Sequence, residues 1–142
     1  MSTKKRSHSA ERKKLVKELD KVFGKIVILL DRKRCVVCGK TENLQCGHLF
    51  SRVAYSTRWD FMNAFCQCRG CNYRHEHDPT PLTLYFINTF GKRAYEQLYR
   101  KYRTPIKYSN EDLKIRLNIL KGVLKRYETD GYKALPRRVE TT

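Results

Sequence analysis

Two Cys-x-x-Cys pairs near the middle of this 142-residue chain are the residues whose type and spacing point most directly to chemistry. The first pair is Cys35 and Cys38, and the second is Cys68 and Cys71. Zn²⁺ binds four soft ligands in a tetrahedron, and two thiolates separated by two residues can reach one ion from a single tight turn. These four cysteines therefore predict a structural zinc site.

The chain has six cysteines, which could alternatively form three disulfides. The N-terminus, however, lacks the apolar stretch of a secretory signal, so we expect reduced thiols in a cytoplasmic protein. The other two cysteines, Cys46 and Cys66, are interpreted as small buried residues outside the zinc site.

Twenty-nine residues separate the two pairs, so a folded insert must lie between them. Residues 44–50 of this insert alternate in polarity, which predicts one strand of a hairpin. His48 lies on that strand, and a neutral imidazole can accept a proton near pH 7, so it is the candidate general base. After the second pair, residues 72–78 predict a short helix that ends before Pro79.

The order of these pieces resembles the HNH, or ββα-metal, nuclease motif built on a treble-clef zinc site. The chain is similar to the phage NinG/Rap recombination family over roughly residues 19–100. The similarity is carried by four segments: LDKVFGKIVILLDRKRCVVCG, CGHLFSR, RWDFMNAFCQCRGCN and LYFINTFGKRAYEQL. The resemblance implies a structure-specific endonuclease that cuts Holliday junctions, D-loops and related branched DNA. It also implies the cytoplasm of a phage-infected bacterium.

The resemblance assigns roles to three residues. His48 holds the position of the motif's base, and Asn63 that of the asparagine that orients the hairpin loop. Asn72 holds the position of a ligand to a catalytic Mg²⁺ or Mn²⁺, for which an amide oxygen is a suitable hard ligand. Many relatives carry an acidic residue or histidine just before the base, but here that position is Gly47. The metal could then be held with one helper ligand from His75, Glu76 or His77, of which His75 has better helical phase than His77. Weak metal binding or lost activity are the alternatives.

The charge of the chain predicts a polyanionic partner. It carries 31 basic and 14 acidic residues, a net charge of +17, divided as +8 over residues 1–34, +1 over 35–78 and +8 over 79–142. Charge alone favours nucleic acid first and an acidic membrane surface second. With the resemblance, DNA is the expected partner and a membrane is not. The residues expected to contact its phosphates are Arg52, Arg58, Arg69, Arg74, Lys13, Lys17 and Lys21. The alternative is that these charges only solvate helix faces.

The pattern of apolar residues predicts the elements that position these groups. Residues 1–8 are expected to be a disordered basic tail, 9–34 an N-terminal basic helix, 35–78 the zinc-braced core, 79–130 C-terminal helices and 131–142 a flexible tail. Gly24 weakens the first helix, so residues 25–30 could instead form a buried strand.

The C-terminal part predicts three helices. Pro81 starts one that Gly91 stops, an apolar stripe from Ala94 to Tyr102 marks the next, and Ser109 caps the third. The third helix carries a leucine seam that could pack on the N-terminal helix or pair with a second copy in a homodimer.

Together these patterns predict a mostly helical α+β fold, with a treble-clef, zinc-braced ββα-metal (HNH) core flanked by N- and C-terminal helices. The expected function is a metal-dependent endonuclease for branched DNA. The alternatives are a non-catalytic zinc-dependent DNA-binding module and an HNH nuclease that acts on linear duplex.

Overall fold

The computed structural model describes residues 3–138 of the chain. It is a mostly helical α+β structure with one two-stranded sheet, as the sequence predicts. The elements in chain order are α1 (Thr3–Leu30), β1 (Leu44–His48), α2 (Tyr55–Arg58), β2 (Ala64–Cys68), α3 (Arg69–His75), α4 (Thr80–Phe90), α5 (Lys92–Arg103), α6 (Asn110–Asp130) and the 3₁₀ helix η1 (Gly131–Ala134). None of the helices within residues 3–138 is long and apolar enough to cross a bilayer.

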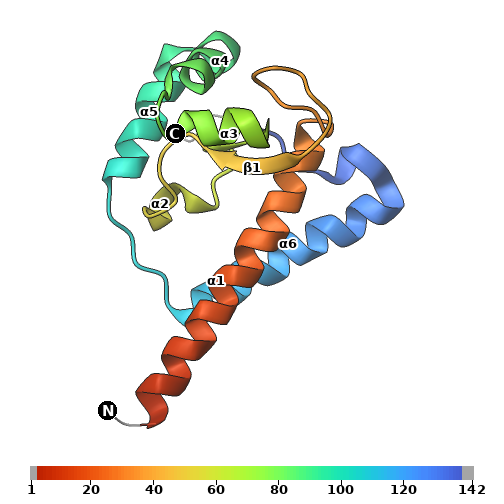
Figure 1. Ribbon diagram of the computed structural model, residues 1–142. Helices are drawn as coiled ribbons and strands as arrows, with labels where there is room; N and C mark the ends of the chain where they lie inside the picture. Colours follow the sequence, from red (N-terminus) through yellow and green to blue (C-terminus); the bar gives the residue numbers. More distant parts are fainter. Residues whose placement is uncertain (1–2, 139–142) are drawn as a thin grey trace.

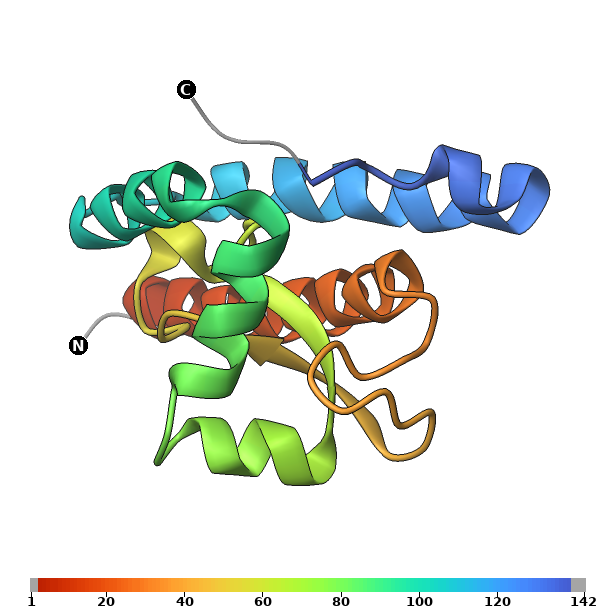
Figure 2. The same cartoon turned by 90° about the horizontal axis from the view of Figure 1, so that it is seen from above.

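The β1–β2 hairpin is the centre of the arrangement (Figures 1 and 2). Helix α1 lies on one face of the hairpin and α3 on the other, and α6 lies along the far side of α1. The strands are antiparallel, with Gly47 opposite Phe65 and Cys46 opposite Cys66. Because side chains alternate along a strand, Cys46 and His48 face α1, whereas Gly47 faces α3.

Helix α1 starts earlier than the sequence predicts. Residues 3–8 are helical rather than a disordered tail, and residues 1 and 2 lie outside the described part. The start of α6 holds these first turns, since Asn110 Nδ2 donates to the carbonyl oxygen of His8 at 3.1 Å. Arg12 likewise donates to the carbonyl oxygen of Tyr108 at 2.8 Å.

The strand alternative for residues 25–30 is wrong, because α1 continues unbroken to Leu30. Gly24 has a packing role instead. A methyl group built on it would lie 3.3 Å from Cys46 Cβ, so the glycine lets the hairpin approach the helix closely. Phe23 and Ile26, on the same helix, are buried in the core beneath β1.

A second core lies on the α3 side of the sheet. Phe65 of β2 packs edge-on against Phe86 of α4, with ring centroids 6.0 Å apart. Helix α4 has Pro81 in its first turn and stops at Gly91, whose φ of 92° suits glycine. The predicted boundaries of this helix are therefore confirmed to within one residue.

Helix α6 begins with the predicted capping box, in which Ser109 and Asp112 each accept a hydrogen bond from the other's backbone N–H. Its seam residues Leu113 and Leu117 are buried in the same core as α1. The seam therefore packs within the chain, as one of the two alternatives predicted. The seam is therefore not free to form the interface of the predicted homodimer.

The segment after α6 is not the flexible tail that the sequence suggested, at least as far as residue 138. Arg138 forms a two-pronged ion pair with Asp31, at 2.6 and 3.1 Å, and donates to the carbonyl oxygens of Phe61 and Ala64. Its side chain is 9% exposed and that of Asp31 is 6% exposed. This contact fastens residues 131–138 to the end of α1; residues 139–142 lie outside the described part.

Candidate active site and metal centre

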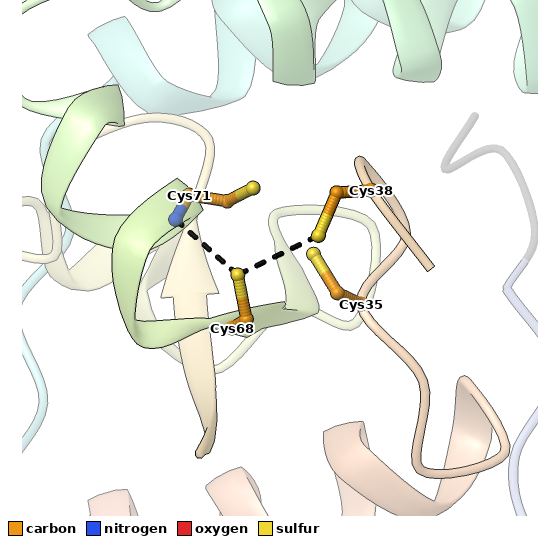
Figure 3. Close-up of side chains that lie close together, drawn as sticks. All are labelled: Cys35, Cys38, Cys68 and Cys71. Carbon is orange, nitrogen blue, oxygen red and sulfur yellow. Dashed lines mark hydrogen bonds between the residues drawn. The ribbon is translucent and has the colours of Figure 1, made fainter. Parts of the chain in front are cut away.

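The four predicted zinc cysteines come together at one end of the hairpin (Figure 3). The sulfur atoms of Cys35, Cys38, Cys68 and Cys71 all lie within 4.8 Å of one another. The Sγ atoms of Cys38 and Cys68 are 3.6 Å apart, close to the ~3.8 Å edge of a tetrahedron with zinc–sulfur bonds of about 2.3 Å. The cluster is thus compatible with a structural zinc ion.

The backbone around the cluster explains why the sulfurs converge. The N–H of Gly39, whose φ is 81°, donates to the carbonyl oxygen of Cys35 at 2.9 Å and closes the first turn. In the second turn, the backbone N–H of Cys71 donates to Cys68 Sγ at 3.4 Å, at the N-terminus of α3. Burial raises the pKa of the Cys35 thiol, but donors led by the backbone N–H of Cys38 outweigh it and lower that pKa to about 7.

Cys46 and Cys66 lie outside this cluster, as predicted. They are cross-strand neighbours in the hairpin. Burial raises the pKa of each thiol to about 12. Both therefore stay protonated near neutral pH and act as packing residues.

His48 ends β1 with its ring stacked on Phe23 of α1, at a centroid distance of 6.0 Å. Its Nε2 lies 2.7 Å from the carbonyl oxygen of Arg58. A carbonyl only accepts, so Nε2 carries the proton and the lone pair of the neutral ring is on Nδ1. Burial lowers the pKa of His48 below 6.5, against the opposing effect of the Arg58 carbonyl. The ring is therefore neutral at pH 7.

Asn63 is fully buried and holds the loop that follows His48. Its Oδ1 accepts from the backbone N–H of Phe50 at 2.8 Å. Its Nδ2 donates to the carbonyl oxygens of Phe50 and Thr57, at 3.0 and 3.1 Å. This amide thus ties the end of β1 to α2, the orienting position that the resemblance implied for it.

Asn72, in α3, lies across from Gly47 on the opposite face of the hairpin from Phe23. Its Nδ2 donates to Gln45 Oε1 at 2.8 Å. A methyl group built on Gly47 would lie 2.7 Å from Asn72 Oδ1. The amide oxygen therefore points at the position that Gly47 leaves without a side chain.

His75 lies one turn further along α3. Its Nε2 is 3.0 Å from the carbonyl oxygen of Leu49, and its Nδ1 is buried without a hydrogen-bond partner among the described residues. His77 is exposed beyond the helix and packs edge-on against Tyr73. Of the two, only His75 faces the hairpin.

A basic groove lies between α1 and the segment around α2, beside the backbone of Arg58 that holds His48. Its volume is about 610 Å³. The lining residues are Ser9, Arg12, Lys13, Val16, Lys17, Asp20, Arg52, Tyr55 and Arg58. Lys21 is exposed one turn further along α1, whereas Arg69 and Arg74 are exposed on α3, away from this groove.

Arg58 is already engaged by α1. Its guanidinium forms a two-pronged contact with Asp20, at 3.0 and 2.6 Å, and Trp59 Nε1 donates to the same carboxylate at 3.0 Å. The side chain of Arg58 is only 14% exposed. Its main effect in this structure is to fix the segment that carries the hydrogen-bond acceptor for His48.

A family model described as the bacteriophage lambda NinG protein matches residues 1–130. The chain belongs to the NinG family. The match extends beyond residues 19–100, over which the resemblance was recognised, and takes in α1 and all of α6. No curated protein and no solved structure matches this chain.

Sequence reasoning missed two residues at the site of this NinG-family chain. Asp20 lies among the lysines of the predicted N-terminal basic helix, and nothing local in the sequence marks it as the partner of Arg58 and Trp59. Gln67 lies between Cys66 and Cys68 and is only 1% exposed. The signal available in the sequence was a single polar residue within the otherwise apolar run 64–68, which forms a fully buried strand in the structure.

Proposed function

We propose that this NinG-family chain is a divalent-metal-dependent HNH-type endonuclease that cuts branched DNA during phage recombination. The observation that carries the proposal is the fixed, neutral imidazole of His48. Its Nε2–H is held by Arg58, and its pKa lies below 6.5 because it is buried. Nδ1 is therefore available as a proton acceptor near pH 7.

His48 would take the proton from the water that attacks the phosphodiester. Asn63 holds the loop that carries this base, through three hydrogen bonds, and so keeps the ring in one orientation. The cysteine cluster ties the loop before β1 to the first turn of α3. That turn carries Asn72, so a structural zinc ion would fix the distance between the two halves of the site.

Asn72 would hold the catalytic Mg²⁺ or Mn²⁺. The donor fits a hard cation, since its neutral amide oxygen points across the hairpin at Gly47 and its amide nitrogen is occupied by Gln45. When bound, the ion neutralises charge on the phosphate and the leaving oxygen.

The groove that is lined by Lys13, Lys17 and Arg52 supports a DNA backbone beside the His48 segment. The guanidinium of Arg52 is exposed and makes no ion pair among residues 3–138, so it can bind phosphate oxygens in a two-pronged geometry. Arg58 contributes by positioning the segment whose backbone carbonyl oxygen accepts from His48 Nε2. No base-reading motif was found in the sequence, which favours recognition of branch shape over base sequence.

A non-catalytic DNA-binding module is the second candidate, and Gly47 is the observation that favours it. Position 47 carries no side chain that could bind a metal. In that case the groove would bind DNA and the zinc site would stabilise the fold, but His48 would not act as a base.

Cleavage of a labelled four-way junction in Mg²⁺ tests the proposal. We expect the zinc-loaded protein to cut the junction in preference to a linear duplex of the same sequence. His48→Ala should lose about 10²–10⁴-fold in rate, the usual contribution of a positioned base. His77→Ala, which changes an exposed histidine, is the matched control and should cut normally.

Other outcomes would decide between the candidates. Junction binding without cleavage by any of the proteins would favour the binding module. Equal cutting by wild type and His48→Ala would remove His48 from the mechanism. Equal cutting of junction and linear duplex would favour the linear-duplex nuclease.

A further inference from the structure

Gln67 buries a carboxamide oxygen without a partner, directly beside the candidate metal position. The residue is 1% exposed, and its Oε1 accepts no hydrogen bond from any described residue. Buried polar atoms are nearly always hydrogen-bonded, and an unpartnered one calls for an explanation such as an ion or a water molecule.

The surroundings of Gly47 locate this oxygen. A methyl group built on Gly47 would lie 2.0 Å from Gln67 Oε1 and 2.7 Å from Asn72 Oδ1. The two oxygens are therefore no farther apart than the sum of these distances. A side chain at position 47 would have to enter the same space, so Gln67 occupies from β2 the place that such a side chain would take from β1.

Two carbonyl-type oxygens this close together, one of them buried, repel unless a cation or a donor lies between them. Asn72 Nδ2 is not that donor, because it is already used by Gln45 at 2.8 Å. Neutral amide oxygens are good ligands for Mg²⁺ and Mn²⁺, which need few protein ligands because they keep several waters. A divalent cation would thus satisfy both oxygens.

We propose that Gln67 Oε1 is a second protein ligand, beside Asn72 Oδ1, of the divalent cation. This inference rests on the proposed function. Position 47 has no side chain that could bind the cation, and Gln67 of the neighbouring strand supplies an oxygen in its place. It also explains why position 47 is glycine, since any larger residue would displace the carboxamide of Gln67.

A buried water is the competing explanation. Gln67 and His75 both line a small void of about 10 Å³ under α3, and His75 Nδ1 is also unpartnered. That volume is at the lower limit for one water molecule. A water there would stabilise the fold but would give Gln67 no influence on cation binding.

Binding of Mn²⁺ to the zinc-loaded protein without DNA separates the two explanations. Electron paramagnetic resonance of free Mn²⁺ measures Kd directly and needs no cleavage activity. We expect Gln67→Met and Asn72→Ala each to raise Kd by about tenfold or more. Gln67→Glu keeps the oxygen and adds a charge, so it should bind as tightly as wild type or more tightly.

The matched control is Gln97→Met. Gln97, in α5, also buries a carboxamide oxygen without a partner, so it controls for the loss of a buried amide and should leave Kd unchanged. Zinc content and Tm of each variant check that it is folded.

A double variant tests the replacement itself. Gly47→Asp combined with Gln67→Ala returns an oxygen to the same space from β1, and it should bind Mn²⁺ more tightly than Gln67→Ala alone. No gain in the double variant would overturn the proposal.

Normal Mn²⁺ binding by Gln67→Met, with loss only in Asn72→Ala, would overturn the role of Gln67 and leave the proposed function intact. Failure of the wild-type protein to bind Mn²⁺ in the millimolar range would also overturn it. The cleavage of junction DNA would then judge the proposed function separately.

Discussion

At the scale of single residues, hydrogen bonds in the candidate site fix which ring nitrogen of a histidine can accept a proton. His48 and His75 both present Nε2 to a backbone carbonyl, which places the lone pair of each neutral ring on Nδ1. Only His75 buries that atom without a partner among the described residues. In the proposed mechanism, His48 is therefore the histidine that would exchange a proton with water.

The pH dependence of cleavage tests this protonation state. Burial places the pKa of His48 below 6.5, so the ring is already neutral at pH 7. The single-turnover rate should be level near pH 7 and fall only as the pH drops through a midpoint below 6.5. Junction binding measured at each pH separates chemistry from affinity. A midpoint above 6.5, or an unchanged profile in His48→Ala, would contradict the assignment.

The same shift affects stability. The unfolded chain takes up a proton at His48 first as the pH falls, because its pKa there is the ordinary 6.5. Titration of His48 therefore does not reduce the free energy of unfolding above pH 6.5. As the pH falls from 6.5 toward the lower pKa of the folded state, the free energy of unfolding decreases.

At the scale of elements, a zinc ion in the cysteine cluster would make the hairpin and α3 one unit, because the cluster lies between the loop before β1 and the start of α3. Helix α3 has only seven residues, too few to be stable alone. Its position opposite Gly47 depends on packing against the sheet and on the cluster at its N-terminus.

Loss of a cluster cysteine should therefore release metal and destabilise the fold. We expect the wild-type protein to hold about one zinc ion per chain and Cys68→Ala to lose it. Its Tm should fall by more than about 5 °C, because a structural metal contributes to folding directly. Metal analysis and calorimetry measure both effects. Cys46→Ala is the matched control; a similar zinc loss there would contradict the assignment of the cluster.

The same scale shows how far the sequence could predict this structure. Local signals predicted the hairpin, the cysteine cluster and the helix start at Ser109, because alternation, spacing and capping act over a few residues. The early start of α1 and the anchored end at Arg138 depend on contacts 102 and 107 positions apart. Gln67 was missed because its importance comes from Gly47 and Asn72, which only the folded hairpin brings beside it.

At the scale of the whole molecule, the two basic ends of the sequence are not separate arms. Helices α1 and α6 pack side by side (Figure 2), and they exchange ion pairs such as Lys114 with Glu11 at 2.7 Å. The exposed lysines of α1 that line the groove remain unpaired within residues 3–138. One set of unpaired basic side chains therefore lies along a face of α1, beside the segment that holds His48.

The salt dependence of junction binding tests this distribution of charge. Each phosphate contact adds about 0.9 to the slope of log K against log salt. Lys13→Gln combined with Lys17→Gln should therefore weaken binding and reduce that slope by about 1.8. Lys107→Gln combined with Lys125→Gln removes the same charge from exposed positions outside the groove, so it should leave the slope nearly unchanged. Equal slopes for the two double variants would mean that net charge, rather than the groove on α1, determines binding.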